Sequence, residues 1–464
     1  MGIIAIGCLL IIFITVFLPR PKTASSDRVG ATNASPPNGR FDRAARLSSA
    51  HPRLNSAGES QPAKTAEEIV AGKLAQFSRA RRGLVQALAR RSGVEVSDDV
   101  NRFFDAVEAG NWDEIEARYK VINGGDGSAS HVAGRPPGVN ELWCAIVDAY
   151  GVAEQVHEWP AQKLLDYGHA VLDSLRPGMV YVGGTDNGRW VPELLNDTSE
   201  GERHIVVTQN GLADGKYLEY LNVLYGDRLA TLTPDDSQRA FQDYMADAQK
   251  RLQHDQQFPD EPKQIRPGED IASVDGHVQV SGMVAVMAIN EKILQTLMQK
   301  NPDLSFALQE SQPFKGTYAD AIPLGPLMEL RAPDAQNAFT PETAAQSVDY
   351  WRTTTQNVLS DPEAAASPYA LKSYSHDANS AANLLAAHDY TAEAEQAYRL
   401  SSQLWPGNPL AAGGLAAILA RTGHADEARQ LLDDFARSYP GERPAIETFR
   451  GSILWTTPQV KPSP

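Results

Sequence analysis

The spacing of hydrophobic residues predicts helices along the first part of the chain. From Thr65 onward, apolar residues recur every three or four positions, as they do on one face of a helix. Residues 97–122 show this spacing twice around Gly110-Asn111, which predicts a helical hairpin. Helices are also expected at about 139–156 and 160–175, after a glycine- and proline-rich loop at 123–138. This region is therefore predicted to be helical.

Short apolar runs replace the helical spacing after Pro177. Met179–Val182 and His204–Thr208 are predicted to be buried strands, with a short helix over Trp190–Leu195 between them. Such a β-α-β unit makes its two strands parallel. The remaining predicted elements are helices at about 214–226 and 235–254, a polar loop at 255–276, a β-like start and long helix over 278–299, and strands at Leu304–Leu308 and Leu327–Leu330.

A repeat with a period of 34 residues lies near the end of the chain. Its matching positions are Ala394 with Ala428, Tyr398 with Leu432, and Pro406 with Pro440. Small residues occur where two helices would approach, a bulky residue follows one turn later, and proline closes each unit. This pattern resembles the tetratricopeptide repeat, whose stacked helix pairs present a concave surface to another polypeptide. The resemblance implies binding of a partner and says nothing about catalysis.

These patterns together predict the fold class α + α/β. It comprises an N-terminal helical region, a small α/β domain with a mixed or parallel sheet, and C-terminal tetratricopeptide-like helical repeats. Two repeats alone are marginal, because stacking usually needs about three. A helix starting at Thr340-Pro341 and the α/β domain are therefore expected to complete the packing. The expected divisions are 1–19 as membrane anchor, 20–63 as disordered linker, 64–156 as helical region, 157–335 as α/β domain and 340–455 as repeats.

Residues 3–18 form an apolar run without a charge. This run is short for a membrane span, which needs about 20 residues. No Lys or Arg precedes it and no clear cleavage site follows, which favours an uncleaved anchor over a signal peptide. Arg20, Lys22 and Arg28 would keep the following residues in the cytoplasm, whereas an extreme N-terminal anchor more commonly leaves them outside. The sequence predicts a single-pass membrane protein whose soluble part is periplasmic or extracellular.

Charge and cysteine content narrow the range of partners. The net charge of −16 disfavours nucleic acid, because phosphate binding needs a basic face. Residues 1–55 hold seven Arg and Lys against Asp27 and Asp42, so the rest of the chain is more acidic than the whole. Arg79, Arg81 and Arg82 lie opposite the apolar face of the first helix; a solvated face is the first interpretation, and contact with anionic lipid the second. The two cysteines, Cys8 and Cys144, exclude a cysteine-based zinc site by number.

The loop Gly183–Trp190 is the best candidate ligand site. It follows the first predicted strand and opens a helix, which is where ligands bind in parallel sheets. Carboxylate and amide groups there suit a metal or a sugar hydroxyl, a guanidinium suits a phosphate or carboxylate, and an indole suits stacking on a ring. In the alternative interpretation, the glycines make a turn and a polar residue caps the helix. The candidate ligand-binding residues are Asp186, Asn187, Arg189 and Trp190, with Asn210 from the end of the second strand.

No catalytic motif accompanies this loop. The sequence contains no HExxH pair and no Gly-x-Ser-x-Gly elbow, so no catalytic residue, metal or cofactor is predicted and enzymatic activity is left open.

Residues from about Leu175 to Arg331 show a second resemblance. It rests on Pro177–Tyr181 leading to Asp186-Asn187, and on Val278–Ser281, Asn301–Asp303, Phe306–Glu310 and Gly325–Met328. The stretch resembles the soluble region that follows the membrane domain in bacterial multipass glycosyltransferase-like proteins, relatives of protein O-mannosyltransferases. The multipass domain that houses catalysis there is not seen in this sequence. The resemblance therefore implies an accessory role in binding a sugar or a partner, and no transferase activity.

Two functions follow as hypotheses. In the first, the repeats of a membrane-anchored scaffold bind a helix or peptide of a partner protein, mainly through side chains buried in their groove. The candidate partner-binding residues are Tyr398, Trp405 and Leu415. In the second, the loop Gly183–Trp190 serves a carbohydrate-related enzyme or accessory subunit.

Overall fold

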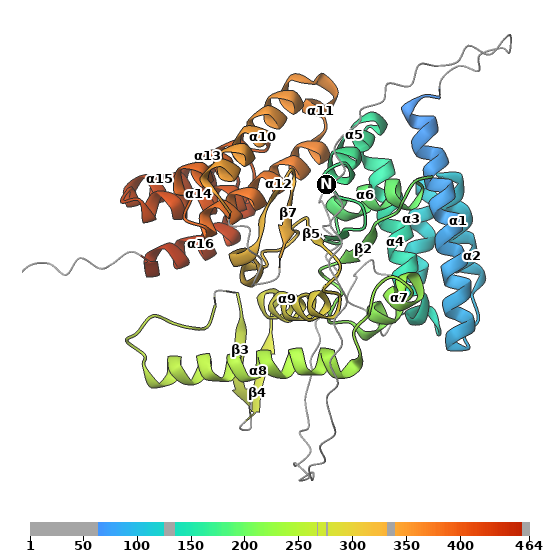
Figure 1. Ribbon diagram of the computed structural model, residues 1–464, viewed down its shortest axis with the longest axis horizontal. Helices are drawn as coiled ribbons and strands as arrows, with labels where there is room; N and C mark the ends of the chain where they lie inside the picture. The colour runs from blue at the N-terminus through green and yellow to red at the C-terminus, as the bar shows by residue number, and fades with distance from the viewer. Residues whose placement is uncertain (1–63, 125–134, 267, 275–276, 332–338, 457–464) are drawn as a thin grey trace, which may run out of the picture. The chain divides into compact units, whose positions relative to one another are not determined.

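Five helices build the N-terminal region, in the order that the hydrophobic spacing predicts (Figure 1). The computed structural model describes residues 64–124, 135–266, 268–274, 277–331 and 339–456. Thr65 and Glu68 form a capping box at the start of α1, and Gly93 ends that helix in the left-handed conformation. The helices are α1 (Ala66–Ser92), α2 (Asp98–Ala109), α3 (Trp112–Ile122), α4 (Val139–Glu158) and α5 (Ala161–Leu172).

A five-stranded mixed sheet follows, in the order β2-β1-β5-β7-β6. The predicted parallel pair is confirmed, since β1 runs parallel to both β2 and β5. Strand β7 pairs antiparallel with β5 and β6, and β6 is a strand that the apolar runs did not predict. The strands are β1 (Val180–Gly183), β2 (Ile205–Thr208), β5 (Phe306–Leu308), β6 (Ile322–Leu324) and β7 (Leu327–Leu330).

Both edges of this sheet are protected from pairing with another chain. Helix α6 (Asn187–Asp197) connects β1 to β2, and α7 (Gly215–Tyr225) follows β2. The hydroxyl of Tyr217 accepts a hydrogen bond from the backbone N–H of Thr208 at 2.6 Å, and the hydroxyl of Tyr225 accepts one from Val206 at 3.4 Å. At the opposite edge, Pro323 lacks an N–H in the middle of β6. Neither edge strand therefore offers a complete row of free backbone groups to another chain.

We expect Tyr217→Phe to lower the free energy of unfolding by about 1–3 kcal/mol, because it leaves a buried N–H without an acceptor. Urea unfolding of the two proteins measures this difference. Tyr439→Phe is the matched control, since the Tyr439 hydroxyl makes no hydrogen bond within the described ranges, while its ring packs on Phe435 and beside Gly407. Equal losses in the two variants would show that the Tyr217 hydroxyl does not stabilise the edge of β2.

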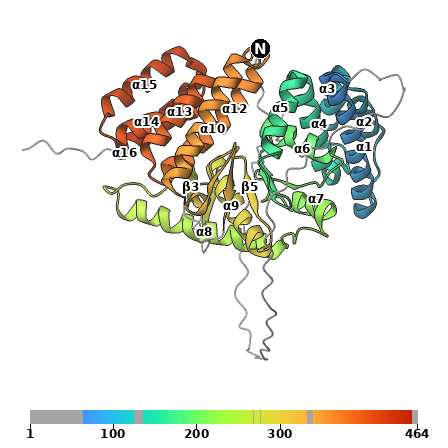
Figure 2. The same ribbon diagram turned by 45° about the horizontal axis from the view of Figure 1, so that its top comes forward.

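A long helix and a small hairpin extend from the sheet. Helix α8 (Pro234–Gln257) lies beside α9 (Met283–Lys300), and both contact the two-stranded hairpin of β3 (Asp270–Val274) and β4 (His277–Ser281) (Figures 1 and 2). The polar loop predicted over 255–276 therefore needs correction, because it contains β3. The strand was missed because Ile271 is buried among Asp270, Ala272 and Ser273, which are exposed and interrupt any apolar run.

Helices α10–α16 form the C-terminal region. Helices α12, α14 and α16 contact one another in sequence, while α13 and α15 pack against α12 and α14. As expected for a short array, α10 packs on α13, and the α/β domain covers α12 through β6, β7 and the 3₁₀ helix η2 (Lys315–Asp320). Their bounds are α10 (Pro341–Ser360), α11 (Pro362–Ala366), α12 (Pro368–Ala387), α13 (Thr391–Leu404), α14 (Pro409–Arg421), α15 (Ala425–Ser438) and α16 (Arg443–Thr456).

The helices of the structure do not agree with the prediction of a membrane-spanning helix. In the part of the chain that the structure describes, no helix is long and apolar enough to cross a membrane. The long helix α4, for example, carries Glu141, Asp148 and Glu154 among its apolar residues. The prediction of a single-pass membrane protein with a periplasmic or extracellular soluble part is therefore not retained. The predicted anchor and linker, residues 1–63, lie outside the described residues.

Candidate functional site

The carboxyl ends of β1, β2 and β5 meet at one edge of the sheet, as parallel strands must. Polar residues from all three strand ends gather there. The Asn210 amide donates to the Thr185 hydroxyl at 2.9 Å, and the Gln209 amide donates to the Gln312 carbonyl at 3.1 Å. The structure thus brings Asn210 beside the loop Gly183–Trp190, where the β-α-β prediction places it.

Two residues of that loop are engaged inside the protein. Arg189 uses all three guanidinium nitrogens: on Gly184 at 2.7 Å, on Glu193 at 2.6 Å and on Asp148 at 2.9 Å. Trp190 is 5% exposed and lies flat against α4, where a Cβ on Gly151 would come within 2.1 Å of the indole. Both side chains therefore fix α6 against its neighbours.

Helix α12 covers the other end of the loop. The Asn187 amide donates to the Ser373 hydroxyl of α12 at 2.6 Å. Asp186 precedes α6 without capping it through its side chain, and its Oδ1 has no hydrogen-bond partner among the described residues. Ligand binding at Asp186, Asn187 and Asn210 stays a prediction.

A buried ion network ties the N-terminal helices to α6. Arg81 is 2% exposed and contacts Glu193 at 2.6 Å and Asp197 at 2.7 Å. Asp148 joins Arg189 to the hydroxyl of Tyr220, which donates at 2.7 Å. Burial raises the pKa of Glu193, and the charges of Arg189 and Arg81 oppose that rise. Arg81 was predicted to lie on a solvated or lipid-contacting face, and that prediction is wrong because its acidic partners come from distant helices.

A second buried carboxylate joins the sheet to the repeats. Asp377 of α12 accepts from the Tyr167 hydroxyl at 2.8 Å and from the Gln309 amide at 2.7 Å. Burial raises the pKa of Asp377 from 3.8 to about 6, although both hydrogen bonds act in the opposite direction. No motif in the sequence marks this residue, which is a single aspartate inside a helix.

Glu310, at the end of β5, contacts the first repeat in a similar way. It accepts from the Asn383 amide of α12 at 3.1 Å and from the Tyr318 hydroxyl. The Tyr398 hydroxyl in turn donates to Asn383 Oδ1 at 2.8 Å, so the inner side of α12 already holds groups of this chain. Burial raises the pKa of Glu310, against the hydrogen bonds from Tyr318 and Asn383.

The predicted partner-binding residues have different surroundings. Tyr398 and Leu415 are buried at 4% and 7% exposure, and Tyr398 packs so closely on α14 that a Cβ on Gly414 would lie 2.3 Å from its ring. Trp405 is half-buried, with the Lys372 ammonium 4.9 Å from its ring centre. Partner contact by these residues stays a prediction, and Trp405 is the most accessible of them.

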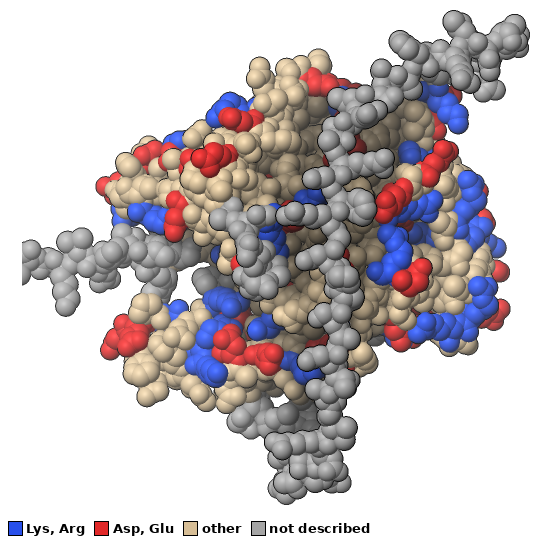
Figure 3. Space-filling view, in the orientation of Figure 1, with Lys and Arg blue, Asp and Glu red and all other residues tan. Residues whose placement is uncertain are grey.

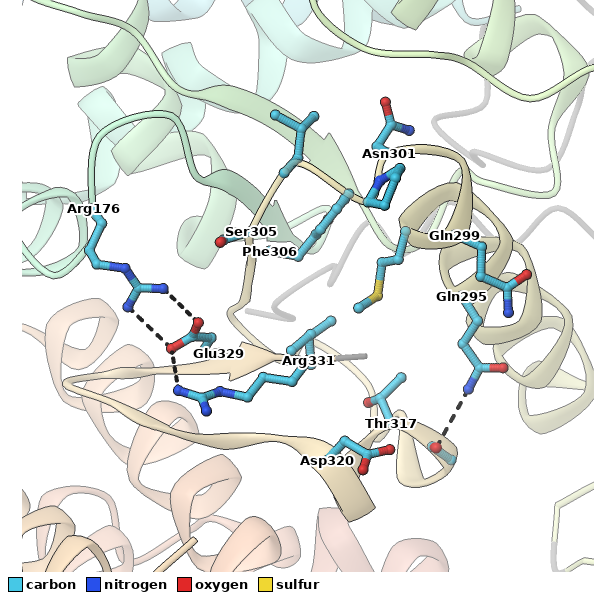
Figure 4. A pocket seen from close by; sticks show the side chains of 15 residues that line it. Arg176, Gln295, Gln299, Asn301, Ser305, Phe306, Thr317, Asp320, Glu329 and Arg331 are labelled. Atoms are coloured by element: carbon cyan, nitrogen blue, oxygen red, sulfur yellow. Dashed lines mark hydrogen bonds and ion pairs between the residues drawn. The ribbon is translucent and has the colours of Figure 1, made fainter. Parts of the chain in front are cut away.

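A cavity of about 700 Å³ lies at the opposite end of the sheet from the predicted loop. It is bounded by the start of β5, the end of β7, the last turns of α9 and the 3₁₀ helix η2 (Figure 4). Its volume falls in the range of small-molecule sites. Sequence reasoning missed it, because its lining comes from residues spread between 176 and 331 with no shared motif.

Three charged groups meet on one wall of this cavity. Arg176 donates to both oxygens of Glu329, at 2.5 Å and 3.1 Å, and Arg331 approaches the same carboxylate at 3.4 Å (Figure 4). Burial acts to raise the pKa of Glu329, but the hydrogen bonds and charges of Arg176 and Arg331 outweigh it, and the pKa lies below its usual value. Glu329 is therefore ionised at neutral pH and faces two guanidinium groups.

A metal site is not assembled in the part of the chain described here. Within those ranges, no group of three or more His, Cys, Asp or Glu side chains is arranged to hold a metal ion.

Comparisons with known proteins identify the C-terminal region. Residues 379–453 match the family model of the tetratricopeptide repeat. This range runs from the second half of α12 into α16 and includes both predicted repeats. No curated protein and no solved structure matches the chain. The resemblance of the middle region to glycosyltransferase-like proteins therefore gains no support.

Proposed function

We propose that this protein is an interaction protein that binds a partner polypeptide through its C-terminal tetratricopeptide repeats. The observation that carries this proposal is the match of residues 379–453 to the tetratricopeptide family, over helices that stack in pairs. Such arrays bind other polypeptides on the layer formed by one helix of each pair. No comparison, and no arrangement of side chains among the residues that the structure describes, favours an enzymatic function over this one.

The free part of the array decides where a partner can bind. Helix α12 is covered by the α/β domain, through Asn383 on Glu310 and Asp377 on Tyr167. The partner is therefore expected on α14 and α16, where Ala417 and Arg443 are exposed. A polar groove of about 470 Å³ lies between α15 and α16 and is lined in part by Arg437, Arg443 and Arg450.

Side chains of both signs of charge lie on the surface of the repeat helices, which affects the kind of partner they can bind. On the face shown in Figure 3, acidic and basic side chains lie intermixed over the repeat helices. Arg450 pairs with Asp433 and Glu447, and Arg437 pairs with Asp434, so these charges are largely matched. A partner held by a single sign of charge is therefore disfavoured, and packing on the repeat helices is expected to supply the affinity.

Site-specific photo-crosslinking in intact cells tests this proposal. A photoreactive residue at Ala417 or Arg443 is expected to capture the same polypeptide, because both positions lie on the free end of the array. The matched control is Arg239, a 71% exposed side chain on α8, which is expected to capture nothing in common with them. Capture of one polypeptide from Arg239 but from neither repeat position would contradict the proposal.

The second hypothesis, a carbohydrate-related site at Gly183–Trp190, keeps fewer candidate groups. Arg189 and Trp190 are committed to the interior, which leaves Asp186, Asn187 and Asn210 at the half-buried rim. The repeats therefore remain the better supported site of function.

A further inference from the structure

We propose that the carboxyl edge of the sheet, where the loops after β1 and β5 meet helix α12, binds a primary ammonium group through Asp186 and Ser311. This inference goes beyond the proposed function of the repeats and does not depend on it. It rests on the close approach of the two side chains, on a surplus of hydrogen-bond acceptors around them, and on the charge of Asp186, which has no ion pair among the described residues.

The missing side chain of Gly184 lets Asp186 and Ser311 come close together. A Cβ on Gly184 would lie 2.5 Å from Asp186 Oδ2 and 2.4 Å from Ser311 Oγ, so both side chains lean over this glycine. Both residues are half-buried, and neither of these two atoms makes a hydrogen bond within the described part of the chain. A carboxylate oxygen and a hydroxyl are therefore close enough to contact one small ligand group.

The neighbouring side chains at this edge leave acceptor oxygens without a donor. Gln309 is 3% exposed and donates its amide N–H to Asp377, while its Oε1 atom has no partner among the described residues. This oxygen lies at the first turn of α6, where a Cβ on Gly188 would be 2.3 Å from it. The Oδ1 atoms of Asn210 and Asp186 are buried and unpaired in the same ranges. Buried acceptors without a donor cost free energy, so a ligand rich in donors is favoured here.

The charge at this edge is negative. The guanidinium of Arg189, three residues after Asp186, is bonded to two other carboxylates of the interior and is not shared with Asp186. Burial raises the pKa of Asp377, the charge of His376 acts against that rise, and the negative charge of Asp186 adds to it. The carboxyls of Asp186 and Asp377 are therefore close enough to repel each other, and a ligand cation would relieve that repulsion.

A primary ammonium group matches this edge better than other ligands do. It carries three N–H donors and no acceptor, which suits a carboxylate, a hydroxyl and a surplus of acceptors. A metal ion is disfavoured, because no group of three or more His, Cys, Asp or Glu side chains in the described ranges is arranged to hold one. The position also fits, since ligands of parallel strands bind at the carboxyl ends, and β1, β2 and β5 end here.

Ligand-observed NMR titrations of the full chain test the site with three compounds that share a hydroxyethyl group. The first, 2-aminoethanol, carries an ammonium group; choline carries the same charge without N–H donors, and 1,2-ethanediol carries neither. We expect 2-aminoethanol to bind with a Kd in the millimolar range and the other two to bind at least about tenfold more weakly. Nα-acetyl-lysinamide, compared with 2-aminoethanol, distinguishes a lysine side chain of a partner from a small free amine, and tighter binding of either one supports the site.

Two variants remove the proposed contacts. Asp186→Asn removes the charge and keeps the shape, and the fold is expected to be kept because the Asp186 side chain does not cap α6. This variant is expected to bind 2-aminoethanol about tenfold more weakly than the wild type, and no better than choline. Ser311→Ala, which removes the hydroxyl alone, is expected to weaken 2-aminoethanol severalfold.

Asp303→Asn is the matched control, because Asp303 is an exposed carboxylate that precedes β5, at the opposite end of the sheet. It is expected to bind all the compounds as the wild type does. The proposal is overturned if 2-aminoethanol does not bind the wild type at tens of millimolar, if choline or 1,2-ethanediol binds as tightly, or if both Asp186→Asn and Ser311→Ala bind as the wild type does. None of these results bears on the repeats, whose test is the crosslinking at Ala417 and Arg443.

Discussion

Arg81→Met is expected to lower the free energy of unfolding by about 3–5 kcal/mol at neutral pH. The guanidinium is 2% exposed and contacts Glu193 and Asp197. Its removal leaves Glu193 with Arg189 as its ion-pair partner and takes from Asp197 its ion-pair partner among the described residues. Breaking a buried ion network by removing one partner costs far more than the network contributes to stability as a whole. Urea unfolding followed by circular dichroism measures the loss.

Arg79→Met is the matched control on the same helix. Its side chain is 57% exposed and pairs with Glu108 at the surface, so the expected loss is below about 1 kcal/mol. The loss caused by Arg81→Met is also expected to shrink towards pH 5, because a protonated Glu193 no longer needs a cation. A loss of equal size in both variants would mean that the buried network does not hold α1 to α6.

Asp377→Asn is expected to change how stability depends on pH. Burial raises the pKa of the folded Asp377 carboxyl from 3.8 to about 6, so the folded protein holds this proton more tightly than the unfolded chain. As pH rises from about 4 to about 6, the unfolded chain loses the proton first, and the wild type becomes less stable. The difference between the two pKa values corresponds to about 3 kcal/mol. The variant cannot titrate at this position, so the wild type is expected to lose about that much relative to it.

Urea unfolding of both proteins between pH 4 and pH 7.5 gives the comparison, and other buried carboxyls cancel in the difference. The variant can keep both hydrogen bonds if Gln309 turns its amide, because the Gln309 Oε1 atom has no partner among the described residues. Asp389→Asn serves as the control; this exposed residue has φ 62°, which asparagine tolerates, and its effect is expected within about 0.5 kcal/mol. The contrary result would be two free energies of unfolding that differ by an amount that stays constant with pH. That result would show that the pKa of the Asp377 carboxyl does not change on folding.

Only part of the candidate site could be predicted from the sequence. The β-α-β pattern places Asn210 beside the loop Gly183–Trp190, and the structure has these two segments together. The pattern could not show that Arg189 of α6 pairs with Asp148, because the sequence around an arginine does not reveal whether its partner is a ligand or another helix. The cavity escaped for a related reason: an empty volume depends on how four elements pack, and no local pattern records it.

The sequence by itself determined most of the local structure of this protein, apart from the strands β3 and β6. Apolar spacing, the Thr65 cap, the glycines that end helices and the 34-residue repeat act within a few turns of the chain, so each can be recognised without the rest of the fold. The tertiary structure alone decided which polar groups became partners. Arg81 meets Glu193 across 112 positions and Tyr167 meets Asp377 across 210. Such pairs form because the core packs two distant helices together and a buried charge must then find an opposite charge or a hydrogen bond.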